Sequence, residues 1–446
     1  MYLPHLSSTT RPVSLRRRVI SLSLPVLLSS LLQRLVSIVD IFLVGGVGAS
    51  AIAATGIGQL LLFVVMTIFW GLGTGVTVVI AHQYGRGEHL QRRRTATASL
   101  VVSLSLSLAI SLAGWVWGGE MARFLGATDN VLHGATAYIR PVFLLFFFTA
   151  GINTLSAVMH GSGETRRPMQ AIVLVNIIHI LAAIPLIYGF GPLPSRGVVG
   201  AAYAINISEA SGFLVLLLSA IRQGHLSLSP DFTLFRRVVR VGFPVALERI
   251  AQQSGQLLYS KMIISYGTTA YAAHQIGLSI ESLSFMPGAG MGIAAAALMG
   301  QSLGARKFAR ARMGHREALR LAVIVMGGMA LLFLLLPEQL LSLFTRDHEV
   351  IRHGVVFLRL VALAQVPLAI SFVYAGSLRG TGDTAYVFYV TLGVMWGVRV
   401  LLAWIASRIL GMSLYAVWGV FVIDWYVRAF FFARRFHRRD LHEVIL

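Results

Sequence analysis

A single carboxylate, Asp40, lies inside the apolar stretch that runs from Leu22 to Val47. A segment of this length can cross the roughly 30 Å hydrocarbon core of a bilayer. A charge inside it costs at least ~2.5 kcal/mol unless it is paired, protonated or hydrated. We therefore interpret Asp40 as a residue that binds and releases a proton. The alternative is a permanent ion pair with Arg34 or Lys261.

Other polar side chains are candidates to line a cavity in the N-terminal half. His179 lies among apolar residues and either relays protons, lines a substrate pocket or only packs; histidine suits the first role because it changes charge between pH 5 and 8. Glu209 is the second acidic candidate. Three amides either hydrogen-bond Asp40 in one protonation state or join neighbouring helices: Gln33, Asn176 and Asn206. Pro25 removes a backbone hydrogen bond early in the segment of Asp40 and allows it to bend.

The C-terminal half holds more charges in its apolar stretches, namely Glu248, Arg249, Lys261, Glu281, Arg399 and Asp424. Charges inside a membrane protein usually pair with one another. We expect a structural cluster in which Lys261 pairs with Glu281 or Asp424. Glu248 lies about two turns from the basic run that precedes it, so we expect it to pair near the membrane boundary.

The composition indicates an all-α polytopic membrane protein. Of the 446 residues, 56% are hydrophobic and only 12% are charged. Apolar stretches of 18 or more residues recur, and the first is too long for a cleavable signal peptide. Twelve transmembrane helices are expected near 19–45, 53–82, 95–117, 131–159, 170–190, 198–221, 241–265, 270–301, 318–336, 350–378, 385–407 and 412–433.

The net charge of +20 is a topology signal. Most arginines fall in the N-terminal arm from Arg11 to Arg18, in alternate loops and in the tail from Arg434 to Arg439. By the positive-inside rule these segments are cytoplasmic, so both termini are expected inside a bacterial inner membrane. We expect contact with anionic lipids and no nucleic-acid partner.

The two halves of the chain repeat with an offset of 219 residues, as in Pro25 and Pro244, or Gly85 and Gly304. The expected domains are an N-terminal lobe, 1–221, a cytoplasmic linker, 222–240, and a C-terminal lobe, 241–446. Six spans per copy make the repeats parallel, and such lobes enclose a central cavity with alternating access. Asp40 corresponds to Tyr259 in the second copy. We therefore expect the N-terminal lobe to couple ion binding to the conformational change and the C-terminal lobe to have a mainly structural role.

No enzyme motif is present. The sequence HEVIRH at 348–353 lacks the spacing of a zinc helix, and no GxSxG elbow occurs. The cluster GLGTG at 71–75 lies in an apolar segment without a preceding strand or a Walker lysine, so we attribute it to helix packing. We expect no cofactor and no bound metal other than the coupling ion.

Several motifs together resemble the multidrug and toxic compound extrusion (MATE) family, and more narrowly its DinF-like prokaryotic branch. They are VDIFLVGGVGASAIAATGIG at 39–58, HQYGRGE at 82–88, AAHQIGLSIESLSFMPGAGMG at 272–292 and GQSLGA at 300–305. The resemblance implies a monomeric cation-coupled antiporter with two bundles around a V-shaped cavity. It also implies that Asp40 is the coupling carboxylate and Pro25 the bend point.

The chain departs from the DinF-like pattern at Ala183, where relatives often carry a second carboxylate in the fifth span. A sodium ion wants several oxygen ligands, so the loss favours protons over sodium. We expect export of amphipathic, cationic or aromatic compounds. Two alternatives remain open: a flippase for lipid-linked precursors, which needs several cations in the cavity, and a scaffold or receptor without transport.

Overall fold

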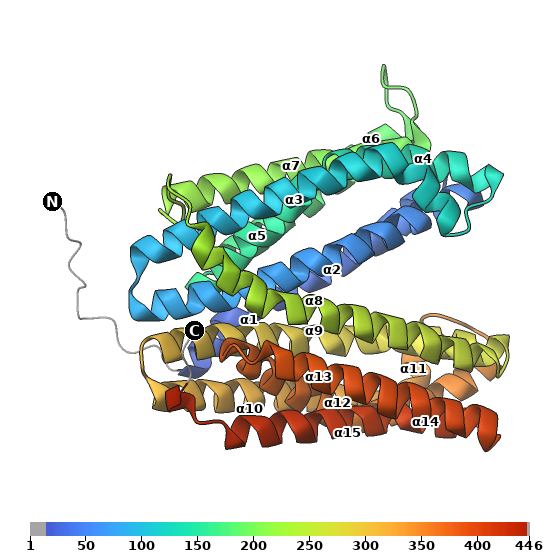
Figure 1. The fold of residues 1–446 in the computed structure, drawn as a ribbon. Coiled ribbons are helices and arrows are strands. Elements are labelled where there is room, and N and C mark those ends of the chain that lie inside the picture. The colour runs from blue at the N-terminus through green and yellow to red at the C-terminus, as the bar shows by residue number, and fades with distance from the viewer. Residues whose placement is uncertain (1–14, 444–446) are drawn as a thin grey trace.

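The computed structural model describes residues 15–443, so Arg11 of the predicted cytoplasmic arm lies outside the described part. The described chain is helical throughout (Figure 1), apart from an isolated bridge between Phe190 and Leu193. The N-terminal lobe contains α1 (Leu15–Gly45), α2 (Ala49–Arg86), α3 (His89–Phe124), α4 (Asp129–Leu144), α5 (Phe146–Ser162), α6 (Arg166–Tyr188) and α7 (Gly197–Arg222).

The C-terminal lobe repeats this order. It contains α8 (Phe232–Ile264), α9 (Thr268–Gly304), α10 (Phe308–Leu335), a short α11 (Pro337–Ser342), α12 (His348–Gly380) and α15 (Leu414–Arg438), followed by the turn η3 (Leu441–Glu443). Between α12 and α15 one span is assembled from α13 (Thr384–Val394), η1 (Met395–Val400), α14 (Leu401–Trp404) and η2 (Ile405–Ile409).

The helices correspond to the expected spans. Between residues 15 and 443, ten helices are long and apolar enough to cross a membrane, and the pair α4 and α5 adds one span that is bent by 49°. The remaining long helix, α8, carries more charge but packs along α2 and α13. It begins at Phe232, earlier than expected, so residues 232–240, about half of the predicted linker, are helical.

The bend between α4 and α5 has a specific partner in the neighbouring helix. The helix breaks at Leu145, a few residues after Pro141. The carbonyl of Pro141 accepts a hydrogen bond of 2.8 Å from the side-chain amide of Asn206 on α7. Asn206 therefore satisfies a carbonyl that the interrupted helix leaves free, which is the structural role expected of an amide between membrane helices.

The two lobes meet in matching ways around a pseudo-twofold axis. Gly85 at the end of α2 lies against the carbonyl of Gln301, and Gly304 at the end of α9 lies against the carbonyl of His82. These positions are related by the repeat offset. Any Cβ atom there would collide with backbone, so only glycine allows the two helices to approach so closely.

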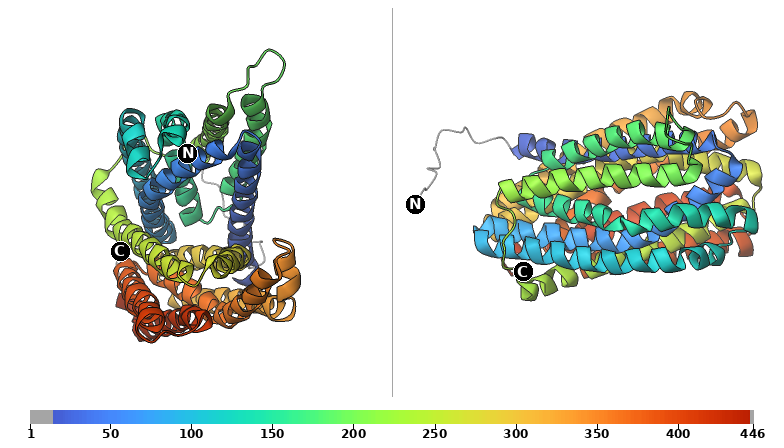
Figure 2. Two further views of the ribbon diagram at one scale, coloured as in Figure 1. Left: turned by 90° about the vertical axis from the view of Figure 1, so that its right-hand side faces the viewer. Right: turned by 90° about the horizontal axis from the view of Figure 1, so that it is seen from above.

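The lobes are in contact at one end and diverge toward the other. Near the described N-terminus, Arg18 donates to Gln301 at 2.8 Å, and His82 lies 2.8 Å from the carbonyl of Gly380. Toward the opposite end α2 and α8 spread apart in Figure 1, and the view along the helices shows the two groups as separate layers (Figure 2). The start of α1 and the end of α15 lie at this closed end.

Candidate functional site

The structure brings Asp40 on α1 together with His179 on α6. The imidazole Nε2 lies 2.5 Å from Oδ1 of the carboxylate. The His179 side chain is only 5% exposed, whereas that of Asp40 is 21% exposed. The histidine is thus held by packing, while the carboxylate keeps access to a cavity. This contact is not the ion pair with Arg34 or Lys261 that the sequence left open.

The cavity beside Asp40 has a volume of about 160 Å³ and lies within the N-terminal lobe. Three uncharged polar side chains line it with the Asp40–His179 pair: Thr55, Gln59 and Tyr138. The other lining residues are small or aliphatic, among them Val44, Ile52 and Ala201. Among residues 15–443 no group of three or more His, Cys, Asp or Glu side chains could hold a metal ion. The chemistry that this cavity offers is proton exchange at one carboxylate and one imidazole.

Pro25 lies inside α1 and leaves a backbone carbonyl without its helical donor. Because proline has no N–H, the carbonyl of Ser21, one turn earlier, cannot accept the usual hydrogen bond. That carbonyl instead accepts a bond of 3.0 Å from the hydroxyl of Thr165, which lies just before α6. The N-terminal part of α1 is therefore tied to the loop between α5 and α6, at the point where the helix is free to bend.

The other candidate residues of the N-terminal lobe do not contact Asp40. Gln33 and Glu209 line a second, central cavity. Asn176 is buried, and its amide nitrogen has no hydrogen-bond partner in the described chain. Asn206 donates a hydrogen bond to the carbonyl of Pro141. Among the described residues no amide hydrogen-bonds Asp40 in this conformation. Gln33 lies two turns before Asp40 on α1, and Asn206 has the alternative role, that of joining neighbouring helices.

The central cavity lies between the lobes and has a volume of about 430 Å³. Aromatic side chains from both lobes line it, namely Trp70, Phe285, Phe372, Trp425 and Phe432. Its charged lining residues are Glu209, Glu248, Arg249, Arg379 and Arg428. A mostly apolar pocket with a few polar groups is the usual form of a site for small organic molecules.

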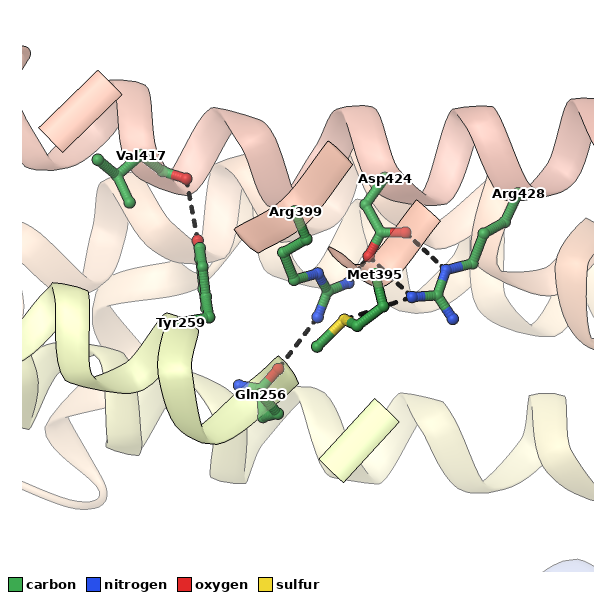
Figure 3. A network of polar contacts seen from close by, with 7 residues as sticks. All are labelled: Gln256, Tyr259, Met395, Arg399, Val417, Asp424 and Arg428. Atoms are coloured by element: carbon green, nitrogen blue, oxygen red, sulfur yellow. Dashed lines mark hydrogen bonds and ion pairs between the residues drawn. The ribbon is translucent and has the colours of Figure 1, made fainter. Parts of the chain in front are cut away.

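Two groups of ion pairs contain several of the buried charges of the C-terminal lobe. Glu248 on α8 accepts bonds of 2.7 and 2.9 Å from Arg379 on α12, and a third of 3.2 Å from Thr391. Asp424 on α15 is fully buried between Arg399 and Arg428, and the Nε of Arg428 lies 2.6 Å from its carboxylate (Figure 3).

The pairing predicted for Lys261 is wrong. Lys261 is exposed near the end of α8 and forms no ion pair with the described residues, because Asp424 already has two arginine partners. Glu281 is buried, and its carboxylate makes no hydrogen bond or ion pair with residues 15–443. Arg399 also donates to Gln256 at 3.0 Å, so one guanidinium joins α15, η1 and α8 (Figure 3).

Some of these residues had a signal in the sequence and others had none. Arg428 follows Asp424 by four residues, which is the spacing of an ion pair on one helix face. Arg379 lies in the last turn of α12, and no sequence spacing relates it to Glu248, with which it pairs in the wall of the central cavity. Trp70, Gln59 and Tyr138 resemble any other residue of an apolar helix, and only the arrangement of the helices brings them to a cavity.

The chain is similar to known transporters along most of its length. The family model MatE matches residues 25–184 and 244–405, once in each half. A probable multidrug resistance protein NorM of Thermotoga maritima is 26% identical over 92% of this chain and 89% of its own length. A probable multidrug resistance protein YoeA of Bacillus subtilis is 25% identical over 88% of this chain and 87% of its own length.

Solved structures share the fold. A MOP superfamily transporter from Pyrococcus furiosus superposes with a TM-score of 0.87 at 24% identity, covering 96% of this chain and 98% of that one. A MATE transporter from Vibrio cholerae gives a TM-score of 0.90 at 18% identity over the same shares. Since the MatE model covers well over half of the sequence, this chain belongs to the MATE family, whose members are membrane transporters and not enzymes.

Proposed function

We propose that this protein exports amphipathic organic compounds in exchange for protons, and that Asp40 binds the exchanged proton. The names of its relatives in Thermotoga maritima and Bacillus subtilis support drug-like compounds as cargo. The observation that carries the proposal is the contact between Asp40 and His179 beside a cavity in the N-terminal lobe.

The contact suits proton coupling because its strength depends on charge. A carboxylate and an imidazolium attract strongly, whereas a protonated carboxyl group loses most of that attraction. Protonation of Asp40 therefore weakens the link between α1 and α6 and favours another packing of α1 about Pro25. A bound ion shifts such an equilibrium only through its different affinity for the two states.

Sodium is the less favoured coupling ion. Na⁺ is a hard cation that takes several oxygen ligands, and imidazole nitrogen suits softer metals. Here a nitrogen of His179 faces the carboxylate of Asp40, and Ala183 stands where relatives of the DinF-like branch often carry a second acid. The remaining oxygens around the cavity belong to uncharged Thr55, Gln59 and Tyr138.

The conformation described here is then the outward-facing one. The lobes touch at the end where α1 begins and α15 ends, and the basic loops favour a cytoplasmic position for that end. We place the transporter, as a monomer of the DinF-like branch, in a bacterial cytoplasmic membrane. A flippase for lipid-linked precursors is less favoured, because Arg379, Arg399 and Arg428 are already paired with carboxylates.

The test is efflux from proteoliposomes, driven in turn by a pH gradient and by a sodium gradient. Rhodamine 6G and rhodamine B are suitable fluorescent probes, one a cation and the other a carboxylate. We expect pH-driven efflux of at least one dye by the wild type and its loss in Asp40→Asn. Asp231→Asn is the matched control, because Asp231 caps α8 in an exposed loop and asparagine caps equally well.

Three results would contradict the proposal. The first is full activity of Asp40→Asn. The second is efflux that follows only the sodium gradient. The third is an equal loss in Asp231→Asn, which would show a general defect of reconstitution.

A further inference from the structure

The charged residues of the central cavity are not all neutralised. Of its charged lining residues, Glu248 is bound by Arg379 and Arg428 is bound by Asp424. Arg249 and Glu209 form no ion pair with residues 15–443. Arg249 is therefore the unpaired cation of the described cavity wall.

An arginine without a carboxylate partner is energetically unfavourable at the position of Arg249. This residue lies near the middle of α8, next to Glu248, and an unpaired charge within a membrane-spanning helix is unfavourable and marks a functional site. Its guanidinium lies 5.0 Å from the ring centre of Trp70 on α2, across the boundary between the lobes. The indole orients the guanidinium and offsets part of the cost, but it does not neutralise the charge.

The geometry leaves the hydrogen-bonding edge of Arg249 available. Its side chain is exposed to the cavity and makes no hydrogen bond with the described residues. A guanidinium carries five N–H donors in a planar fork that matches a carboxylate, and it stacks on an aromatic ring by its face. Stacking on Trp70 therefore leaves the donors at the edge for a ligand.

We propose that the central cavity binds aromatic compounds that carry a carboxylate, and that Arg249 binds this group. The inference rests on the proposed function, because it names the substrate class of the same transporter. Trp70, Phe285 and Phe372 supply apolar surface for the aromatic part. Glu209, the unpaired acid on α7, is where an additional amine of a zwitterionic compound would bind.

The test is equilibrium binding to the purified full-length protein by isothermal titration calorimetry in a neutral detergent. Three probes share one ring system: 2-naphthylacetate, its methyl ester, and 2-(2-naphthyl)ethylamine. A charge-assisted hydrogen bond predicts that the carboxylate binds roughly tenfold to a hundredfold more tightly than the ester. We expect Arg249→Gln to abolish this preference, Arg249→Lys to retain part of it, and Arg249→Glu to favour the amine.

The control is Arg359→Gln, which removes an exposed arginine on α12 that does not line the cavity. It should leave the preference unchanged. The inference is overturned if the carboxylate binds no better than the ester, if no probe binds, or if the preference survives in Arg249→Gln. Tighter binding of phosphatidylglycerol at Arg249 than of naphthylacetate would also overturn it, in favour of a lipid phosphate.

The result of this binding experiment does not depend on whether the proposed proton-coupled export is correct. Binding in detergent requires neither an ion gradient nor a proton on Asp40. If the wild type shows no preference for the carboxylate but still exports rhodamine 6G in response to a pH gradient, only the inference about the substrate class is wrong. A clear preference without any pH-driven efflux would instead leave the binding site standing and remove the coupling mechanism.

Discussion

Two membrane-embedded aspartates have opposite surroundings. Asp424 has a side chain that is 0% exposed and is held by two arginines, whereas Asp40 has one histidine partner and is 21% exposed. A buried carboxylate between two guanidinium groups is paired on both sides, and a side chain that is 0% exposed has no contact with solvent. Asp424 therefore suits a structural role, and Asp40 suits a role that requires exchange with solvent.

Replacing Asp424 by asparagine should strongly destabilise the C-terminal lobe. The change leaves Arg399 and Arg428 buried without a counter-charge, and removal of one partner from a buried ion pair costs about 3–5 kcal/mol. We expect a clear fall in the melting temperature of the purified protein, measured by intrinsic tryptophan fluorescence in detergent. Arg428→Met combined with Asp424→Asn should recover part of the loss, because one of the unpaired charges is gone.

The matched control for this prediction is Glu349→Gln. Glu349 pairs with Arg352 at 2.7 Å along α12, but these side chains are 59% and 67% exposed. An exposed helix pair contributes only about 0–1 kcal/mol, so the melting temperature should barely change. If Glu349→Gln lowers the melting temperature as much as Asp424→Asn does, burial of the ion pair does not explain the destabilisation.

For single residues, the sequence shows that a charged side chain is functionally or structurally important more readily than it shows which side chain pairs with it. Asp40 stands out because it is the carboxylate of an apolar segment, and Arg428 follows Asp424 at helical spacing. The candidate partners named for Asp40 were Arg34, Lys261 and three amides, but not His179, because spacing along one helix says nothing about the rotation of another. The same limit produced the incorrect pairing of Lys261.

At the scale of elements, α1 joins the coupling site to the closed end of the molecule. Asp40 lies in its last turns and Arg18 in its first, with Pro25 between them. Arg18 reaches Gln301 of the other lobe, and the carbonyl of Ser21 is held by Thr165. A change at Asp40 can therefore affect the contact between the lobes through the helix that contains both.

Thr165→Val should weaken this connection. Valine keeps the shape of the buried threonine but removes the hydroxyl, so the carbonyl of Ser21 loses its donor. Leaving a buried acceptor unsatisfied costs about 1–3 kcal/mol. We expect a lower melting temperature together with slower pH-driven efflux in proteoliposomes.

Ser37→Ala is the control on the same helix. The hydroxyl of Ser37 is exposed and bonds only the carbonyl of Gln33 within α1, so its removal should change neither measurement. If Thr165→Val lowers stability but leaves the efflux rate unchanged, the bond would be structural and α1 would bend without it.

The existence of the helices was largely predictable, and their irregularities were not. Hydropathy located the spans because every backbone group in lipid must be satisfied within a helix. The bend at Leu145 and the early start of α8 at Phe232 depend on neighbours, since Asn206 satisfies the carbonyl of Pro141 and α2 packs along α8. A pattern of apolar residues contains no information about such contacts.

At the scale of the whole molecule, the repeat becomes a symmetric contact between lobes. The sequence predicts the duplication but not which glycines meet across it. Gly304 on α9 faces the carbonyl of His82, and Gly85 on α2 faces that of Gln301. Because these contacts lie at the end where the lobes touch, they determine how tightly that end closes.

Gly304→Ala should therefore shift the protein away from this conformation. The added methyl group meets backbone atoms of His82, and overpacking of this kind costs about 1–3 kcal/mol, or roughly fivefold to a hundredfold in an equilibrium. Because the natural chain contains no cysteine, Ser30→Cys provides a single reporter in the central cavity. We expect slower labelling of this thiol by an impermeant maleimide added outside right-side-out vesicles, and faster labelling in inverted vesicles.

Gly328→Ala separates this effect from the general consequence of adding a methyl group to a helix. Gly328 lies within α10, and an added Cβ there meets nothing within 4 Å, so the labelling rates should match those of the reporter alone. Unchanged rates in Gly304→Ala would mean that the contact of α2 with α9 does not hold this end shut. The bonds of Arg18 and His82 across the lobes would then be the next contacts to remove, because they cross the same boundary without depending on glycine.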